Sequence, residues 1–269
     1  MYETWEEECV AINGYNKFQK SAQKKEGLKK GRKAGGLVVY VKTSVKKVEI
    51  LSNGMNEVLW LKLNAENIML LIGTVYRQPS QSNYYNERFF PQLLEEIEEM
   101  KIRYPGSEMM IGGDFNSRVG SESELIDMNT DYDMFGREIQ NNIPERASKD
   151  TELNTNGKKL LDICKKSDLI ICNGRTKGDK LGEFTFVSKQ GKSCIDLILV
   201  TPQLWLGMEI DLIVGERVDS SHFPIIIHLK LPCFNQINEE NCKKLIKYRW
   251  KEEKKENFLR KIGNDKYNF

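Results

Sequence analysis

Asp114 and Asn116 are a carboxylate and an amide that could act together on a bound ligand. They stand in the run Gly-Gly-Asp-Phe-Asn, directly after the apolar segment Glu108–Ile111. Residues two apart in an extended segment point to the same face, so we expect this carboxylate and amide to lie side by side. Gly112 and Gly113 would leave room for a close ligand. Such a pair suits metal-assisted attack of water on a phosphate, although the same run is also typical of a simple turn.

Asp196 and His222 form a second candidate pair. Asp196 interrupts the apolar run Ile195–Val200, where a carboxylate needs a polar partner to offset its desolvation. The chain has two histidines, and His228 is interpreted as a strand residue, whereas His222 lies at a loop-to-strand junction that can face a cleft. An aspartate that orients an imidazole is a recurrent catalytic arrangement.

Strands and helices must position these residues, and hydrophobic periodicity predicts both. The predicted strands are Leu37–Val41, Val58–Leu63, Ile68–Val75, Glu108–Ile111, Leu169–Cys172, Glu183–Val187, Ile195–Val200, Glu209–Val214 and Pro224–Leu231. Apolar residues three and four apart predict helices at Asn83–Arg103 and Thr155–Lys166. The polar stretch Gly120–Lys149 is predicted to be a long loop beside the Asp114 strand. Mixed strands with two interspersed helices indicate an α/β sandwich.

Six short motifs occur in a characteristic order. They are Glu3-Thr4-Trp5, Gly35–Tyr40, Thr74–Arg77, Gly112–Asn116, Ile195–Ile198 and Ser221–Pro224. This ordered set resembles the endonuclease/exonuclease/phosphatase family, and most closely the endonuclease domain of non-LTR (LINE-type) retrotransposons. The resemblance covers residues 1–232 and implies a layered sandwich of two mixed β-sheets flanked by helices, with the first strand of the family missing.

The resemblance implies a phosphodiesterase that uses Mg²⁺, or Mn²⁺ as a substitute, and nicks DNA to leave a 3′-hydroxyl. Glu3 would hold the metal, Tyr76 would contact the scissile phosphate, and Arg77 would bind substrate. Mg²⁺ takes oxygen ligands, uses few protein carboxylates and keeps several waters, which agrees with these assignments.

The resemblance also gives roles to the two candidate pairs. Asp114 and Asn116 would activate and orient the attacking water. Asp196 would support His222, which would bind phosphate oxygens and stabilise the charge that develops in the transition state.

Two departures from the family pattern predict impaired activity. Ser221 stands where the family has an aspartate before the histidine, and the strand that carries a metal-site asparagine upstream of Glu3 is absent from this sequence. An abasic-site endonuclease or another phosphoesterase of the same fold, and an inactive nucleic-acid-binding remnant, remain open as alternatives.

Basic residues cluster near the start of the chain. Between Lys17 and Lys47 there are eleven lysines and arginines against one acid, although the whole chain has a formal net charge of +2. Such a stripe could neutralise DNA phosphates, and a solvated flexible loop is the alternative. The substrate-binding candidates there are Lys24, Lys25, Lys29 and Lys30.

The remaining features concern domains and location. Residues 233–269 are rich in Lys and Glu, with apolar residues spaced for a helix between Asn238 and Ile262, and are expected to form a charged helical extension. The sequence lacks a secretory signal and any apolar run long enough for a membrane span, and its six cysteines lack CxxC spacing. We therefore expect a nuclear or cytoplasmic protein that binds DNA and no membrane. The oligomeric state is left open.

Overall fold

The computed structural model describes residues 11–24, 33–51, 54–65, 68–125, 142–217 and 220–230. Contacts divide the chain into two units, Met1–Leu231 and Pro232–Phe269. The whole second unit, with the helix expected between Asn238 and Ile262, lies outside the described residues.

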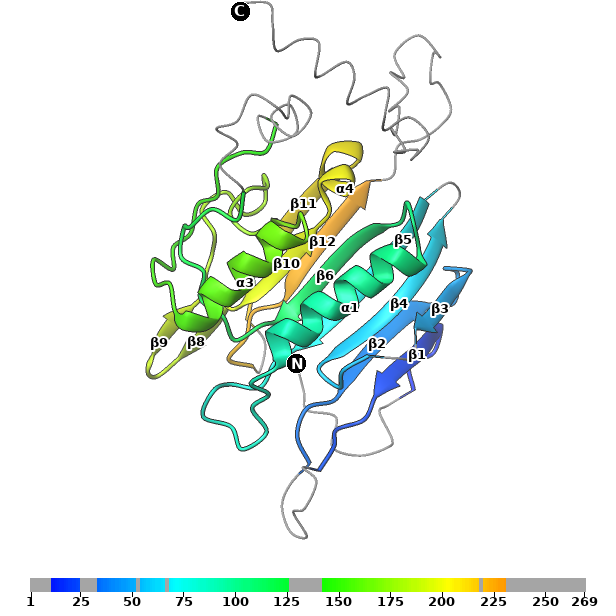
Figure 1. The fold of residues 1–269 in the computed structure, drawn as a ribbon, viewed down its shortest axis with the longest axis horizontal. Helices are drawn as coiled ribbons and strands as arrows, with labels where there is room; N and C mark the ends of the chain where they lie inside the picture. The colour runs from blue at the N-terminus through cyan, green and yellow to red at the C-terminus, as the bar shows by residue number, and fades with distance from the viewer. Residues whose placement is uncertain are drawn as a thin grey trace, which may run out of the picture. The chain divides into compact units, whose positions relative to one another are not determined.

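A six-stranded mixed sheet forms the centre of the first unit (Figure 1). Its strands, in spatial order, are β3 (Val48–Leu51), β4 (Val58–Ala65), β5 (Ile68–Tyr76), β6 (Glu108–Asp114), β10 (Asp196–Val200) and β7 (Ile170–Ile171). The β5–β6 pair is parallel and the other neighbours are antiparallel. Helix α1 (Phe89–Arg103) provides the crossover that a parallel pair requires.

Both faces of this sheet are buried, which explains why its strands read as continuous apolar runs. In β10, Leu197 and Leu199 belong to one hydrophobic cluster, whereas Ile198 and Val200 belong to another. Helices α1 and α3 (Thr155–Lys166) cover the first face, as Figure 1 shows. The helices that the structure describes include none with the length and hydrophobicity of a membrane span.

The opposite face packs against smaller elements. A two-stranded antiparallel ribbon, β11 (Glu209–Val214) and β12 (Ile225–Lys230), and the short helix α4 (Pro202–Gly207) contribute to the second cluster. Two further ribbons are β1 (Tyr15–Lys20) with β2 (Leu37–Lys42), and β8 (Phe186–Ser188) with β9 (Gly191–Ser193). The arrangement confirms the predicted fold class of mixed β-sheets flanked by helices.

Most predicted elements are present, with differences at their ends. The helix at Thr155–Lys166 and the strand at Glu209–Val214 have the predicted bounds. The helix predicted from Asn83 begins at Phe89, because the preceding residues form turns in which the Asn86 side chain accepts from the Arg88 N–H at 3.0 Å. Residues 126–141 of the predicted long loop lie outside the described residues.

Candidate active site

Three strands of the central sheet bring Tyr76, Asp114 and Asp196 to one edge. Tyr76 ends β5 and Asp114 ends the parallel strand β6, so the two residues are register partners. Asp196 begins β10, and its Cα is paired with that of Asp114 across the antiparallel β6–β10 interface. Strand register therefore joins three predicted site residues that are far apart in the sequence.

Asn116 reaches Asp114 through a turn. β6 ends at Asp114, and Asn116 has a positive φ of 45°, which asparagine tolerates better than most residues. Its backbone N–H donates to Asp114 Oδ1 at 2.8 Å, and its amide donates to Asp114 Oδ2 at 3.1 Å and to the Arg77 carbonyl at 2.7 Å. The two side chains are adjacent as expected, but the predicted cause, alternation along an extended strand, is wrong.

The glycines before Asp114 serve strand packing. A Cβ at Gly113, whose φ is 143°, would lie 2.0 Å from the carbonyl oxygen of Val75 in β5. A Cβ at Gly112 would lie 2.5 Å from Cδ1 of Ile198 in β10. The expectation that they leave room for a ligand is therefore corrected, since the space beside each is filled by a neighbouring strand.

His222 lies between the two carboxylates. Its Nδ1 is 2.9 Å from Oδ2 and 3.1 Å from Oδ1 of Asp196, and its Nε2 is 3.9 Å from Oδ2 of Asp114. The imidazole packs against the ring of Phe186 with 4.8 Å between centroids. The His222 side chain is 25% exposed, against 4% for Asp114 and 10% for Asp196. The imidazole is thus the accessible member of this cluster.

Thr185 fixes the start of β10. This fully buried residue accepts hydrogen bonds at Oγ1 from the backbone N–H groups of Ile195 and Asp196, each at 3.0 Å. Its backbone N–H donates to Ser193, and its carbonyl accepts from the N–H of Phe223, next to His222. One threonine therefore links the segments that carry Asp196 and His222.

The crowding of Asp114 and Asp196 changes acid–base behaviour. Burial and the nearby charge of Asp196 raise the pKa of Asp114 from 3.8 to about 7. Burial disfavours a charged imidazole at His222, but the hydrogen bond to Asp196 and the charges of both carboxylates outweigh burial and raise the His222 pKa. A carboxyl group that titrates near neutral pH is suited to proton transfer at that pH.

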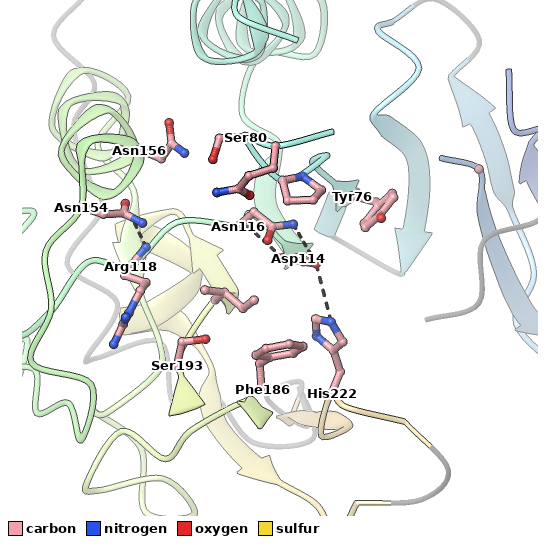
Figure 2. A pocket seen from close by; sticks show the side chains of 14 residues that line it. Tyr76, Ser80, Asp114, Asn116, Arg118, Asn154, Asn156, Phe186, Ser193 and His222 are labelled. Atoms are coloured by element: carbon pink, nitrogen blue, oxygen red, sulfur yellow. Dashed lines mark hydrogen bonds and ion pairs between the residues drawn. The ribbon is translucent and has the colours of Figure 1, made fainter. Parts of the chain in front are cut away.

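A cavity of about 440 Å³ opens beside this cluster. Figure 2 shows Asp114, Asn116 and His222 around it, with Tyr76 nearby. The other side of the cavity is formed by Ser80, Arg118, Asn154 and Asn156. This volume falls within the range typical of ligand sites.

The cluster has donors that suit a divalent cation. Asp114, Asp196 and His222 each present one ligand atom, and these atoms lie within 4.8 Å of one another. Mg²⁺ favours carboxylate oxygens, which the two aspartates supply. His222 Nδ1 faces Asp196, and Asn116 donates to both oxygens of Asp114, so each carboxylate already has a hydrogen-bond partner.

Arg118, on the other side of the cavity, belongs to a different charged cluster. Its Nη2 lies 2.6 Å from Asp150 Oδ1, and its Nη1 is paired with Glu152. Asp150 also accepts from the backbone N–H of Cys194 at 2.9 Å. Burial alone would raise the pKa of Asp150, but these hydrogen bonds outweigh it and lower that pKa.

Arg77 is buried, which corrects its predicted contact with substrate. It is 1% exposed, and its guanidinium lies over the rings of Tyr85, Phe89 and Phe90. Nη2 donates to Oδ1 of Asn156 at 3.1 Å. Arg77 therefore acts from behind the cavity, through its carbonyl on Asn116 and its guanidinium on Asn156.

The other predicted binding residues are separate from this centre or outside the described residues. Lys24 is exposed and lines a second cavity of about 440 Å³, which shares Gly36 and Tyr76 with the first. The predicted metal ligand Glu3 and three predicted substrate-binding lysines lie outside the described residues, namely Lys25, Lys29 and Lys30.

Several residues around the cavity were missed by the sequence analysis. Phe186, Arg118 and Asn156 come from separate loops and elements, and their contacts span many residues. The sequence marks Asn154 just before a predicted helix, which is typical of an N-cap, and its side chain does accept from Gly157 N–H at 2.8 Å. That signal indicates a helix start and gives no hint of a cavity.

Known structures agree with this fold. The chain is similar to the endonuclease domain of TRAS1, a telomere-specific non-LTR retrotransposon, with 17% identity, a TM-score of 0.55, and coverage of 82% of this chain and 80% of that chain. It also matches an endonuclease/exonuclease/phosphatase family protein from Leptotrichia buccalis, at 11% identity and a TM-score of 0.46 over 82% of this chain and 73% of that chain. Truncated TDP2 of Caenorhabditis elegans matches at 13% identity and a TM-score of 0.42 over 80% and 75%. No protein-family model and no curated protein sequence matches the chain.

The protein therefore has the predicted fold, that of the endonuclease/exonuclease/phosphatase family. Within that fold, its similarity to the TRAS1 endonuclease domain agrees with the resemblance found in its motifs.

Proposed function

We propose that this protein is a divalent-metal-dependent endonuclease that cuts one strand of DNA. The observation that carries the proposal is the convergence of Asp114, Asn116, Asp196 and His222, drawn from separate motifs, beside one cavity. The basic stripe between Lys17 and Lys47 supports a polyanionic substrate. Mg²⁺ is the proposed metal, with Mn²⁺ as a substitute, and Glu3 is its proposed ligand.

His222 is suited to bind and neutralise a phosphate oxygen. With Nδ1 hydrogen-bonded to Asp196, the imidazole is held in one orientation and its Nε2 remains toward the cavity side near Asp114. The raised pKa of His222 favours the imidazolium, which donates to an anionic oxygen more strongly than a neutral ring.

Asp114 is the proposed acceptor of the proton from the attacking water. Asn116 donates to both of its oxygens, and the amide is itself held by the Arg77 carbonyl, so the carboxylate is fixed in place. The bound metal would supply Lewis-acid stabilisation of charge on the phosphate. Tyr76, beside Asp114 in the sheet register, is proposed to contact the scissile phosphate.

Ser221 supports a second possibility, an inactive DNA-binding protein of the same fold. It replaces an aspartate of the family pattern with a neutral hydroxyl next to His222, and it is exposed. The loss of a carboxylate weakens the proposed metal site, and a misplaced catalytic group can cost about a hundredfold in rate. We therefore propose that nicking by this chain is slow.

Conversion of supercoiled plasmid to nicked circles tests the proposal. We expect slow nicking with Mg²⁺ and none with a chelator. A much faster cut of an abasic-site duplex than of the plasmid would favour the abasic-site alternative. Binding of DNA without any cutting by Mg²⁺ or Mn²⁺ would favour the inactive alternative and overturn the proposed enzyme.

The basic stripe has its own test. Replacing Lys24, Lys25, Lys29 and Lys30 with Ala should weaken DNA binding for all sequences alike and flatten its dependence on salt, because phosphate contacts carry no base information. An unchanged salt slope would exclude the stripe from the DNA interface. We propose that the protein is located in the nucleus or the cytoplasm.

A further inference from the structure

The side of the cavity that faces the Asp114–His222 cluster carries neutral hydrogen-bonding groups. Ser80, Asn154 and Asn156 line it together with Arg118 (Figure 2). The proposed chemistry at Asp114 and His222 uses none of them. Their arrangement indicates what part of the substrate lies there.

Asn156 is oriented by partners behind it. Its Oδ1 accepts from Arg77 Nη2 at 3.1 Å and lies 3.5 Å from the Tyr85 hydroxyl. A primary amide has an acceptor end and a donor end, and the reverse orientation would set its NH₂ group against the guanidinium, donor against donor. Figure 2 shows the amide nitrogen of Asn156 on the side of the cavity. The buried arginine therefore fixes which end of Asn156 faces the substrate.

Asn154 is held in a comparable way. Its Oδ1 accepts from the backbone N–H of Gly157 at 2.8 Å and from the backbone N–H of Arg118 at 3.3 Å. Because these donors occupy the amide oxygen, the NH₂ group is the end left for the cavity that Asn154 lines. Two amide groups thus offer N–H donors in the same cavity.

The charge on this side disfavours a doubly charged phosphate. Arg118 is paired with both Asp150 and Glu152, so one cation faces two carboxylates and the net charge of this group is negative. A terminal phosphate carries between one and two negative charges at pH 7. An internal phosphodiester carries one, and neutral amide donors can match it without a free cation.

We propose that Asn154 and Asn156 bind an internal phosphate of the DNA strand, adjacent to the phosphate that is cut, and that Arg77 is a positioning residue for Asn156. This inference rests on the proposed function, because it takes the cut phosphate to lie at the Asp114–His222 cluster. The cavity volume, about 440 Å³, is in the range that holds ligands much larger than one phosphate group.

Binding of a fluorescent DNA duplex in a chelator tests the two amides without any catalysis. Asn154→Asp and Asn156→Asp keep an oxygen for the protein donors and replace the cavity-facing NH₂ with an acceptor. Asn156→Ala removes the donor without adding charge. Gln203→Glu, at an exposed position of helix α4, is the matched control for charge. We expect at least about a tenfold rise in Kd for the three site variants, as for the loss of one hydrogen bond to a charged group, and little change for Gln203→Glu. Equal effects in all four variants, or none, would overturn the proposal.

Two substrates separate the neighbouring phosphate from the cut one. Bis(p-nitrophenyl) phosphate has a single phosphodiester, whereas plasmid DNA supplies flanking phosphates. In Asn156→Asp we expect KM for nicking to rise while hydrolysis of the small diester is nearly unchanged. Equal losses on both substrates would place Asn156 at the cut phosphate and refute its proposed role. A wild-type protein that cuts neither substrate would contradict the proposed function. The binding experiment would still show whether Asn154 and Asn156 contact DNA.

The positioning role of Arg77 predicts a specific non-additivity. Arg77→Lys and Tyr85→Phe should each weaken DNA binding in the wild-type background. Each should have little further effect once Asn156→Ala has removed the amide, because residues that act through one group are not additive. Full additivity in folded double variants, checked by thermal melting, would exclude the positioning role.

Discussion

Asp114 and Asp150 are two buried aspartates close to one cavity, with opposite electrostatic environments. Asp114 is 3% exposed and faces a second carboxylate, Asp196, across the strand register. Asp150 is 2% exposed and is held by the Arg118 guanidinium and by two backbone N–H groups. Burial is similar, yet the pKa of Asp114 rises to about 7 and that of Asp150 falls.

This contrast separates a reactive carboxylate from a structural one. A carboxylate whose oxygens accept hydrogen bonds from a cation and from backbone N–H groups has a lowered pKa. It therefore stays ionised and does not take up a proton. A buried carboxylate beside a like charge takes up a proton more readily than an ordinary aspartate. We therefore expect the chemistry to depend on Asp114 and the stability of the fold to depend on Asp150.

The largest expected effect is on nicking. Asp114→Asn keeps the size of the side chain but removes the proton acceptor, and should lower the nicking rate by a factor of about 10² to 10⁴. His222→Ala should act similarly, because the two groups are proposed to work as a unit. Asp150→Asn should leave most of the activity of the folded protein, and a ranking with Asp150→Asn as the worst variant would break the comparison.

The order should reverse for stability. Asp150→Asn removes a charged acceptor from Arg118 and should lower the free energy of unfolding by about 1–3 kcal/mol. Asp114→Asn relieves the repulsion with Asp196 and should leave that free energy unchanged or higher near pH 8. Urea denaturation in a chelator measures both, and a larger loss in Asp114→Asn than in Asp150→Asn would contradict the electrostatic account.

The pH dependence of stability should carry the signature of Asp114. Its pKa is about 7 in the folded protein and 3.8 ordinarily, so between these values the folded state binds more protons than the unfolded state. Unfolding free energy should therefore fall as pH rises through this window, at up to about 1.4 kcal/mol per pH unit. The raised pKa of His222 acts in the same direction, with stability present below pH 6.5 and lost as pH rises further.

Thermal melting of Asp114→Asn should isolate this contribution. Between pH 5 and pH 8, in a chelator, the variant should lose less Tm than the wild type. Other carboxylates titrate in both proteins and cancel in the difference. Equal pH slopes would mean that Asp114 is already ionised at pH 5 in the folded protein.

The smallest expected effect is an increase in the nicking rate. Ser221→Asp places a carboxylate beside His222, which should further favour the imidazolium and add an oxygen near the proposed metal site. We expect Mg²⁺-dependent nicking to rise by a few-fold to about tenfold, within the range of a single charged interaction. Ser220→Asp, which adds the same charge one residue earlier, is the control, and equal gains in both variants would remove any special role for position 221.

Regular elements were largely predictable from the sequence. The helix at Thr155–Lys166 has a full apolar stripe, and the buried strand at Asp196–Val200 is an unbroken apolar run apart from its first residue. The strand Tyr15–Lys20 was missed because its sequence is mostly polar and none of its residues is fully buried, so its pairing with Leu37–Lys42 leaves no hydrophobic pattern. This strand forms because it pairs with a strand distant in the sequence, and its local composition does not predict it.

The candidate site was predictable where a residue violates its local pattern. Asp196 could be found because a carboxylate inside an apolar strand needs a partner, and the structure supplies His222 at 2.9 Å. Asp150 and Arg118 could not be found, because both stand in polar segments where charged residues are unremarkable. The motif that contains Arg77 predicted a contact with substrate. In the structure the Arg77 guanidinium packs against three aromatic rings beneath the cavity.

A mutational scan of this protein would give a misleading result at Thr185, because of the hydrogen bonds that its hydroxyl accepts. One oxygen atom accepts the N–H groups of both Ile195 and Asp196, so Thr185→Val would orphan two buried donors at once while changing little in volume. Such a variant would combine poor folding with the loss of the Asp196 position. In a growth or display selection it would be scored like a catalytic residue, although no atom of Thr185 takes part in the proposed chemistry. Abundance measured alongside activity would be needed to tell a supporting residue of this kind from a reacting one.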